Sequence, residues 1–128
     1  MKKIFDQVGE FDKAFGIPEQ SEPSHSIPDD DRLLYYKLSR EENEEYLDAV
    51  ISRDLKGVAD ALGDELYVII GKFRKHGISA EQAEKIIDEI HLSNMSKLGR
   101  EGRPLYREDG KVLKGENYFE PNIEKCLS

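Results

Sequence analysis

Residues 41–73, EENEEYLDAVISRDLKGVADALGDELYVIIGKF, decide the fold of this chain. Apolar residues recur at three- and four-residue intervals on both sides of a short break around residue 53, as they do in amphipathic helices. The pattern extends back to the aspartates that follow Pro28 and forward to the glycine of the segment KHGI. It predicts two antiparallel helices, residues 31–52 and 54–75.

Two acidic pairs lie within these helices at helical spacing, Glu42 with Glu45 and Asp60 with Asp64. At 100° per residue, the first pair falls in the sector of its helix that also holds Leu34, Leu38 and Ala49, so it points inward. The second pair shares a stripe with Tyr67 and Gly71. The apolar stripe opposite consists of Val58, Leu62, Leu66, Ile69 and Phe73. We therefore expect neither acidic pair to belong to a solvated face.

Inward-facing carboxylates need a partner, because burying an unpaired charge is costly. A divalent cation held among Glu42, Glu45, Asp60 and Asp64 is the simplest partner. Most glutamates of an acidic helix are merely solvated, and Glu44 lies outside the inward sector. Asp60 has a plain alternative as well, since an aspartate near a helix start is favoured by the helix dipole.

Two more helices flank this pair. The first, residues 3–15, has one apolar stripe and ends at Gly16. The last opens with the capping box Ser79-x-x-Gln82 and continues to Gly99. Residues 99–128 form a basic tail with a predicted turn at 108–110 between two short segments that form a hairpin. We expect one all-α domain over 1–128, an antiparallel bundle of about four helices (core 3–98) with an irregular or hairpin tail.

Composition narrows the function classes. The net charge of −8 argues against binding a nucleic-acid polymer. Residues 1–65 hold 17 acidic and 8 basic residues, whereas 66–128 hold 10 and 11. No apolar run is long enough for a signal peptide or a membrane span, and the single Cys126 suits a reducing compartment. We expect a cytoplasmic protein that binds no membrane.

Candidate ligand-binding residues follow in the basic half. Asn94 and Lys97 share one face of the last helix and reach one ligand from one side, although Lys97 also suits a helix C-terminus as an ordinary end charge. Lys111 and Lys114, each beside a glycine, suit a loop that closes over phosphates. Tyr118 either anchors the tail or stacks on a base. A solvated hairpin with ordinary surface lysines is nearly as good an account of this segment. Six bases lie within residues 93–115 and form a basic strip: Lys97, Arg100, Arg103, Arg107, Lys111 and Lys114.

Four blocks in this order resemble a known family: REENEEYLDA, VADALGDELYVIIGKFRKHGI, DEIHLSNMSKLG and YREDGKVLKGENYFEPNI. Together they are similar to the MazG-like branch of the all-α nucleoside-triphosphate pyrophosphohydrolases. That superfamily also contains phosphoribosyl-ATP pyrophosphatase and dimeric dUTPase. The resemblance runs from about residue 4 to residue 127.

The resemblance implies Mg²⁺-dependent hydrolysis of a nucleoside triphosphate, of the deoxyribonucleoside or modified class, to the monophosphate and pyrophosphate, with Mn²⁺ as a substitute metal. The family's Glu-x-x-Glu motif falls on Glu42 and Glu45, which with Asp64 are the expected catalytic residues. Its Glu-x-x-Asp motif ends at Asp64 but has Ala61 at the first position, so Asp60 is the nearest carboxylate. A homodimer or homotetramer is implied as well.

Two alternatives stay open. One is hydrolysis of phosphoribosyl-ATP, which the long basic tail fits poorly. The other is a non-catalytic helical adaptor on the same scaffold, in which the carboxylates bind no metal; four retained carboxylates argue against it.

Overall fold

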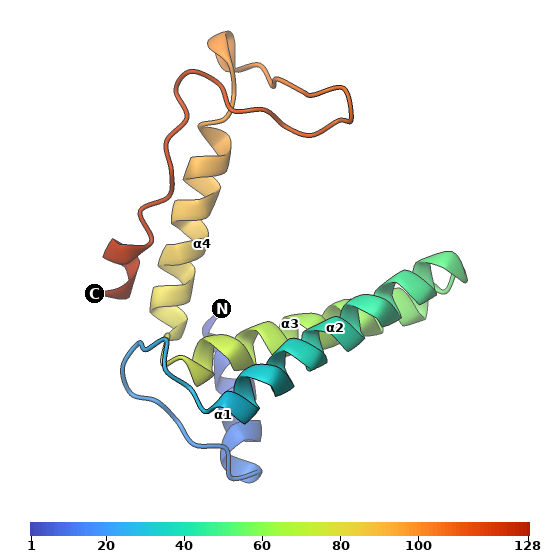
Figure 1. Ribbon diagram of the computed structural model, residues 1–128, viewed down its shortest axis with the longest axis vertical. Coiled ribbons are helices and arrows are strands. Elements are labelled where there is room, and N and C mark those ends of the chain that lie inside the picture. Colours follow the sequence, from blue (N-terminus) through green and yellow to red (C-terminus); the bar gives the residue numbers. More distant parts are fainter. The chain divides into compact units, whose positions relative to one another are not determined.

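The computed structural model describes residues 1–128, apart from the side chain of Arg100. Figure 1 shows its four α-helices: α1 (Lys2–Ala14), α2 (Asp29–Ile51), α3 (Leu55–Lys75) and α4 (Ala80–Met95). Two 3₁₀ turns follow, η1 (Arg100–Gly102) and η2 (Glu124–Leu127). The chain divides into two compact units, Met1–Ala80 and Glu81–Ser128, which are described separately. The all-α prediction is confirmed.

In the first unit, α2 and α3 form an antiparallel hairpin (Figure 1). Helix α2 begins directly after Pro28, and its first turn carries three aspartates, whose negative charges suit the positive end of the helix dipole. Helix α3 begins at a side-chain cap, where an Asp54 carboxylate oxygen accepts a hydrogen bond from the Gly57 amide at 3.0 Å. Both helices agree with the ranges predicted from sequence to within two residues.

Small residues bring the two helices of the hairpin close together. A Cβ added to Gly57 would lie 3.1 Å from the Cβ of Ala49, and one added to Gly71 would lie 3.4 Å from Cε1 of Tyr35. Ala61, between these two contacts along α3, is 2% exposed. The facing surfaces of α2 and α3 are therefore near enough for short carboxylate side chains on opposite helices to meet.

Helix α1 packs against the C-terminal half of α3. Phe5 stacks beside Phe73 with ring centroids 6.1 Å apart, and Phe11 meets Tyr67 edge-on at 5.9 Å. The guanidinium of Arg74 donates to the buried carboxylate of Asp12 at 3.1 Å. These contacts fix the end of the hairpin that lies away from its turn.

The linker between α1 and α2 is tied to the end of α3. The Gln20 side-chain amide donates to the Lys75 carbonyl at 2.7 Å, and the Ser24 amide donates to the His76 carbonyl at 2.9 Å. A Cβ on Gly77, just after α3, would lie 2.1 Å from the Glu22 carbonyl oxygen. The path of the linker therefore requires a glycine at position 77. Residues 17–28, which make up most of this linker, thus form a strap held by polar contacts.

The second unit is α4 with the tail folded back along it. The Ser93 hydroxyl donates to the Phe119 carbonyl at 2.8 Å, and the Asn122 amide donates to a Glu89 carboxylate oxygen at 2.9 Å. The predicted hairpin is present, with an antiparallel bridge between Tyr106 and Val112. Helix α4 ends at Met95, four residues before the predicted Gly99, and a turn follows in which the Lys97 carbonyl accepts from the tail.

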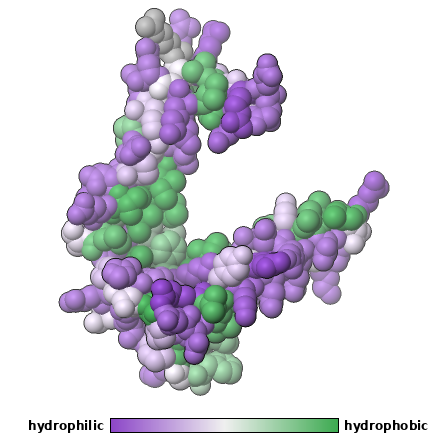
Figure 2. Space-filling model, in the orientation of Figure 1, coloured by the Kyte–Doolittle hydropathy of each residue, from purple (hydrophilic) through white to green (hydrophobic). Residues whose placement is uncertain are grey.

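The apolar stripe of α3 is not the buried face of its unit. Leu62 and Leu66 are each 49% exposed, whereas Ala61, Ile70 and Gly71 are buried. Figure 2 shows further apolar surface at the turn of the α2–α3 hairpin, where Ile51 and Leu55 are also exposed. Among the helices described, none combines the length and apolarity that crossing a bilayer requires.

Candidate metal and nucleotide site

Three carboxylates meet across the α2–α3 hairpin. Glu42 and Glu45 lie one turn apart on α2, and Asp64 faces them from α3. One oxygen from each carboxylate lies within 4.8 Å of the other two. This spacing allows all three oxygens to contact a single cation, because Mg²⁺–oxygen distances are about 2.0–2.1 Å and cis ligands therefore lie about 3 Å apart after modest closure.

Glu42 is the least exposed member of the cluster, and its electrostatic environment is unfavourable for a bare charge. Burial raises the pKa of the Glu42 carboxyl, and the negative charges of Glu45 and Asp64 raise it further. Oxygen Oε2 of Glu42 is buried and has no hydrogen-bond partner among the described residues. Buried polar atoms are nearly always paired in native proteins, so this oxygen is suited to act as a ligand to a bound metal ion.

The exposure of the cluster differs from the sequence-based expectation. Glu45 and Asp64 are exposed in the isolated chain, and only Glu42 is partly shielded. Although their helical positions face the other helix, these side chains lie at the solvent-accessible edge of the α2–α3 contact rather than in a core. An open edge leaves room for waters and phosphate oxygens, which usually supply most ligands of protein-bound Mg²⁺.

Asp60 is not part of this three-residue group. It lines a shallow hollow of about 300 Å³ together with Glu45, Asp48 and Asp54. The buried position next to it, Ala61, is packed into the α2–α3 contact, where a carboxylate would have to displace the close packing. The role of Asp60 as a replacement metal ligand stays a prediction.

The predicted substrate-binding residues all lie in the second unit. The Lys114 ammonium sits 4.6 Å from the centroid of the Tyr118 ring, a cation–π contact that orients both side chains. The Gly115 amide donates to the Lys97 carbonyl at 2.8 Å. This hydrogen bond holds the chain beside Lys114 close to the end of α4. Asn94 and Lys111 are exposed, and their roles stay predictions.

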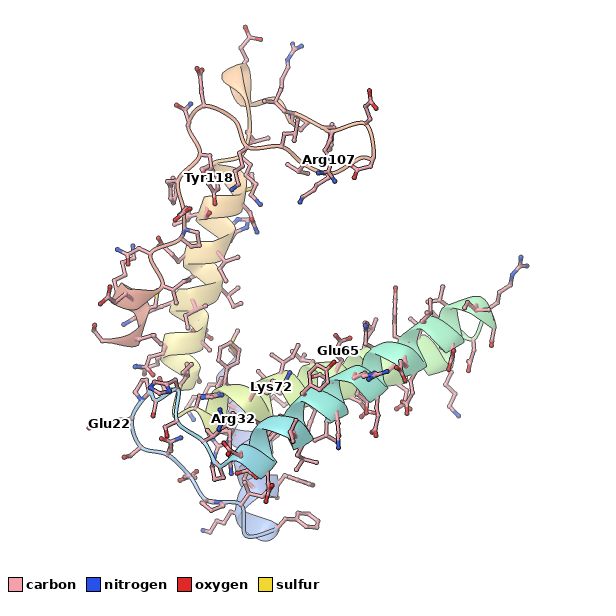
Figure 3. All side chains as sticks on the ribbon, viewed as in Figure 1. Glu22, Arg32, Glu65, Lys72, Arg107 and Tyr118 are labelled. Atoms are coloured by element: carbon pink, nitrogen blue, oxygen red, sulfur yellow. The ribbon has the colours of Figure 1, made fainter. Side chains whose placement is uncertain are left out.

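The basic strip is less free than its sequence indicated. Arg107 forms an ion pair with Asp109 at the hairpin turn, and this pair holds the pKa of the Asp109 carboxyl below its usual value. Figure 3 labels Arg107 on the hairpin and Tyr118 beside α4. The side chain of Arg100, a further member of the strip, lies outside the described part of the chain.

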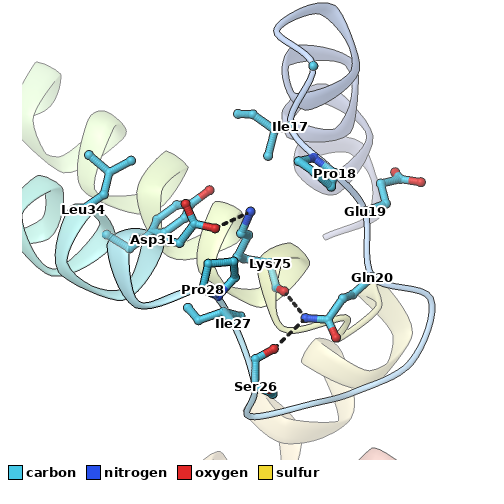
Figure 4. Close-up of a pocket in the computed structure, with 12 residues that line it drawn as sticks. Ile17, Pro18, Glu19, Gln20, Ser26, Ile27, Pro28, Asp31, Leu34 and Lys75 are labelled. Atoms are coloured by element: carbon cyan, nitrogen blue, oxygen red, sulfur yellow. Dashed lines mark hydrogen bonds and ion pairs between the residues drawn. The ribbon is translucent and has the colours of Figure 1, made fainter.

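Sequence reasoning missed a pocket of about 390 Å³ at the other end of the hairpin. Figure 4 shows the Lys75 ammonium paired with Asp31 at 2.9 Å at this pocket, and Lys75 is only 10% exposed. Tyr35 also lines it, and burial, followed by the charge of Asp12, raises the pKa of its hydroxyl. Tyr35 lies seven residues before Glu42, a spacing that returns to the same helix face and was visible in the sequence.

Comparison with known proteins adds two findings. The sequence model of the phosphoribosyl-ATP pyrophosphohydrolase family matches residues 8–94, which include the three clustered carboxylates and Asn94. The chain is also 31% identical over 113 residues to an uncharacterized protein of Acanthamoeba polyphaga mimivirus. That alignment covers 86% of this chain but 41% of the viral protein, so the chain spans less than half the length of this relative.

Proposed function

Because this chain belongs to the phosphoribosyl-ATP pyrophosphohydrolase family, whose activity is hydrolysis of a pyrophosphate bond in a nucleotide, we propose that it hydrolyses a nucleoside triphosphate to the monophosphate and pyrophosphate. The reaction is Mg²⁺-dependent in this proposal, with Mn²⁺ as a substitute. The deoxyribonucleoside or modified triphosphates are the preferred substrate class.

The observation that carries the proposal is the meeting of Glu42, Glu45 and Asp64 within 4.8 Å, with one buried oxygen left unpaired. Carboxylates of this number and spacing repel one another unless a cation is bound. Mg²⁺ held there supplies positive charge that offsets the charge of the phosphates and of the pyrophosphate leaving group.

The chain's own residues have separate tasks in this scheme. Glu42, the most shielded, is assigned to hold the cation, because a buried carboxylate gains most from a compensating charge. Glu45 and Asp64 are exposed, so either can also accept the proton of an attacking water. Lys97, Lys111 and Lys114 are assigned to the phosphates, while Asn94 and Tyr118 are assigned to the nucleoside.

The second candidate substrate is phosphoribosyl-ATP, and the family match is the observation that favours it. The two substrates share the pyrophosphate bond that is cleaved, so the carboxylate cluster serves either equally well. The non-catalytic adaptor is supported only if the cluster binds no metal.

The exposed apolar stripe of α3 supports assembly into a homodimer or homotetramer. Leu62, Leu66 and Ile69 are large, adjacent along one helix face and at least 38% exposed. Apolar surface of this kind is a common mark of a protein interface. Sedimentation of the full chain at several concentrations tests this assembly directly.

A pyrophosphate-release screen tests the proposed function. The full chain is incubated with canonical and modified ribo- and deoxyribonucleoside triphosphates and with phosphoribosyl-ATP, each with Mg²⁺, with Mn²⁺ and with EDTA. We expect release with either metal, none with EDTA, and faster turnover of one triphosphate than of phosphoribosyl-ATP. Preference for phosphoribosyl-ATP would transfer the assignment to the second candidate, and inactivity on every nucleotide would contradict both.

A further inference from the structure

A second pocket, of about 200 Å³, lies where the start of α2 meets the end of α3. Its polar lining combines cationic side chains with two tyrosines: Arg32, Tyr35, Tyr36, Lys72, Lys75 and His76. Figure 3 labels Arg32 on α2 and Lys72 on α3, which both line this pocket. Of these bases, Arg32 comes from the acidic first half of the chain, whereas Lys72, Lys75 and His76 come from residues 66–128.

Acidic partners offset only part of this charge. Arg32 is paired with Asp29, and Lys75 with Asp31. Lys72 has no ion pair with any described residue, so the three permanent cations that line the pocket exceed their two ion-pair partners by one charge. Asp12, whose charge also acts on Tyr35, is itself paired with Arg74.

The strap between α1 and α2 fixes part of the lining. Nδ1 of His76 lies 2.8 Å from the Ser24 carbonyl oxygen, which can only accept, so Nδ1 carries the hydrogen and the ring orientation is set. The side chains of Lys72 and His76 are both half-buried. Their donor groups are thus held near the pocket rather than swinging freely in solvent.

This pocket is distinct from the carboxylate cluster. Lys72 lies eight residues beyond Asp64 on α3, which corresponds to a rise of about 12 Å and a rotation of about 80° around the helix axis. Lysines in a last helical turn also complement the helix dipole, which is the ordinary account of Lys72 and Lys75. That account does not explain why Arg32 and two tyrosines from the start of α2 face the same hollow.

We propose that this pocket binds a phosphate group, either inorganic phosphate or the phosphate of a phosphomonoester. A tetrahedral dianion offers several acceptor oxygens, and guanidinium, ammonium and phenol donors converge here from two helices. The volume exceeds that of phosphate alone and accommodates waters or an attached sugar. The proposal is independent of the proposed hydrolysis, because it requires neither Mg²⁺ nor the carboxylate cluster.

The test is an NMR titration of the ¹⁵N-labelled full chain in EDTA at constant pH and ionic strength. Inorganic phosphate is one arm and ribose 5-phosphate the other, with chloride as the reference anion. The probes are the His76 ring and the amides around Lys72. Variants Lys72→Gln and Arg32→Gln are compared with Lys37→Gln, which removes the same charge from an exposed position on α2 outside the pocket.

We expect saturable shifts with at least one phosphate arm, and a dissociation constant raised about tenfold by Lys72→Gln or Arg32→Gln, the usual effect of losing a charge-assisted hydrogen bond. Lys37→Gln leaves the constant unchanged, and Lys72→Arg largely preserves it. Tighter binding of ribose 5-phosphate identifies a phosphomonoester ligand, whereas equal or tighter binding of inorganic phosphate identifies the free anion. Shifts that never saturate, or that Lys72→Gln and Lys37→Gln weaken equally, overturn the proposal.

Discussion

Replacing Glu42 by Gln is expected to stabilise the metal-free protein while abolishing its response to metal. The substitution keeps the shape of the side chain and removes one of three negative charges that lie within 4.8 Å of one another. Glu42 forms no ion pair with any described residue, so no favourable charge contact is lost. Relief of repulsion is therefore the dominant electrostatic change.

The size of this effect follows from the spacing. Two unit charges 4.8 Å apart repel by about 0.9 kcal/mol at the dielectric constant of water. Glu42 takes part in two such pairs, and salt screening lowers the sum, so we expect a gain of about 1 kcal/mol. For a chain of this size that gain corresponds to a rise in melting temperature of roughly 3–6 °C.

The sign can be checked against pH. The pKa of Glu42 is raised in the folded state, so its contribution to stability is fully present below the unfolded pKa and is lost as pH rises through the folded pKa. The advantage of Glu42→Gln over wild type should therefore be smallest near pH 4 and should grow toward neutral pH.

Thermal unfolding followed by circular dichroism, with EDTA and with excess Mg²⁺, measures both effects. The wild-type protein should gain stability with Mg²⁺, while Glu42→Gln should start higher and gain little. Glu44→Gln is the matched control, because Glu44 is an exposed neighbour paired with Arg40 at 3.0 Å and outside the cluster. A lower melting temperature for metal-free Glu42→Gln, or an undiminished response to Mg²⁺, would refute the reasoning.

Three further predictions concern other parts of the molecule. Asp60→Asn tests the predicted metal ligand that lies outside the three-carboxylate group: kcat should fall by at least about tenfold, or ~1.4 kcal/mol, and a smaller loss in steady-state kinetics would remove Asp60 from the metal ligands. Lys114→Ala should raise KM and reduce its dependence on salt with little change in kcat, and a loss confined to kcat would remove Lys114 from phosphate binding. Leu66→Glu should shift the assembly toward monomer in sedimentation experiments, since it places a charge on the exposed apolar stripe; an unchanged mass would place the interface elsewhere.

The helices could be predicted from sequence because their signals are local. Pro28 with three following aspartates marks the start of α2, and the Asp54 cap marks the start of α3. The meeting of Glu42, Glu45 and Asp64 followed from helical phase in two adjacent antiparallel helices. The early end of α4 did not follow, because it coincides with contacts between residues 93–97 and the tail that are distant in sequence.

Long-range contacts explain what sequence periodicity left out. Lys75 and Asp31 pair across 44 positions of the chain, and the pocket beside them depends on a linker whose path periodicity does not specify. Periodicity also cannot distinguish an apolar stripe that faces the same chain from one that faces another. Leu62 and Leu66 illustrate this, because their pattern was evident but their exposure was not.

The most direct test of the central claim is product identification by ³¹P NMR with the substrate that emerges from the nucleotide screen. The wild-type chain with Mg²⁺ should convert a nucleoside triphosphate into the nucleoside monophosphate and pyrophosphate, without forming a nucleoside diphosphate. Neither EDTA-treated wild type nor Glu45→Gln in Mg²⁺ should produce pyrophosphate at a comparable rate. Release of inorganic phosphate with a nucleoside diphosphate, or undiminished pyrophosphate release by Glu45→Gln, would contradict the assignment of this reaction to the carboxylate cluster.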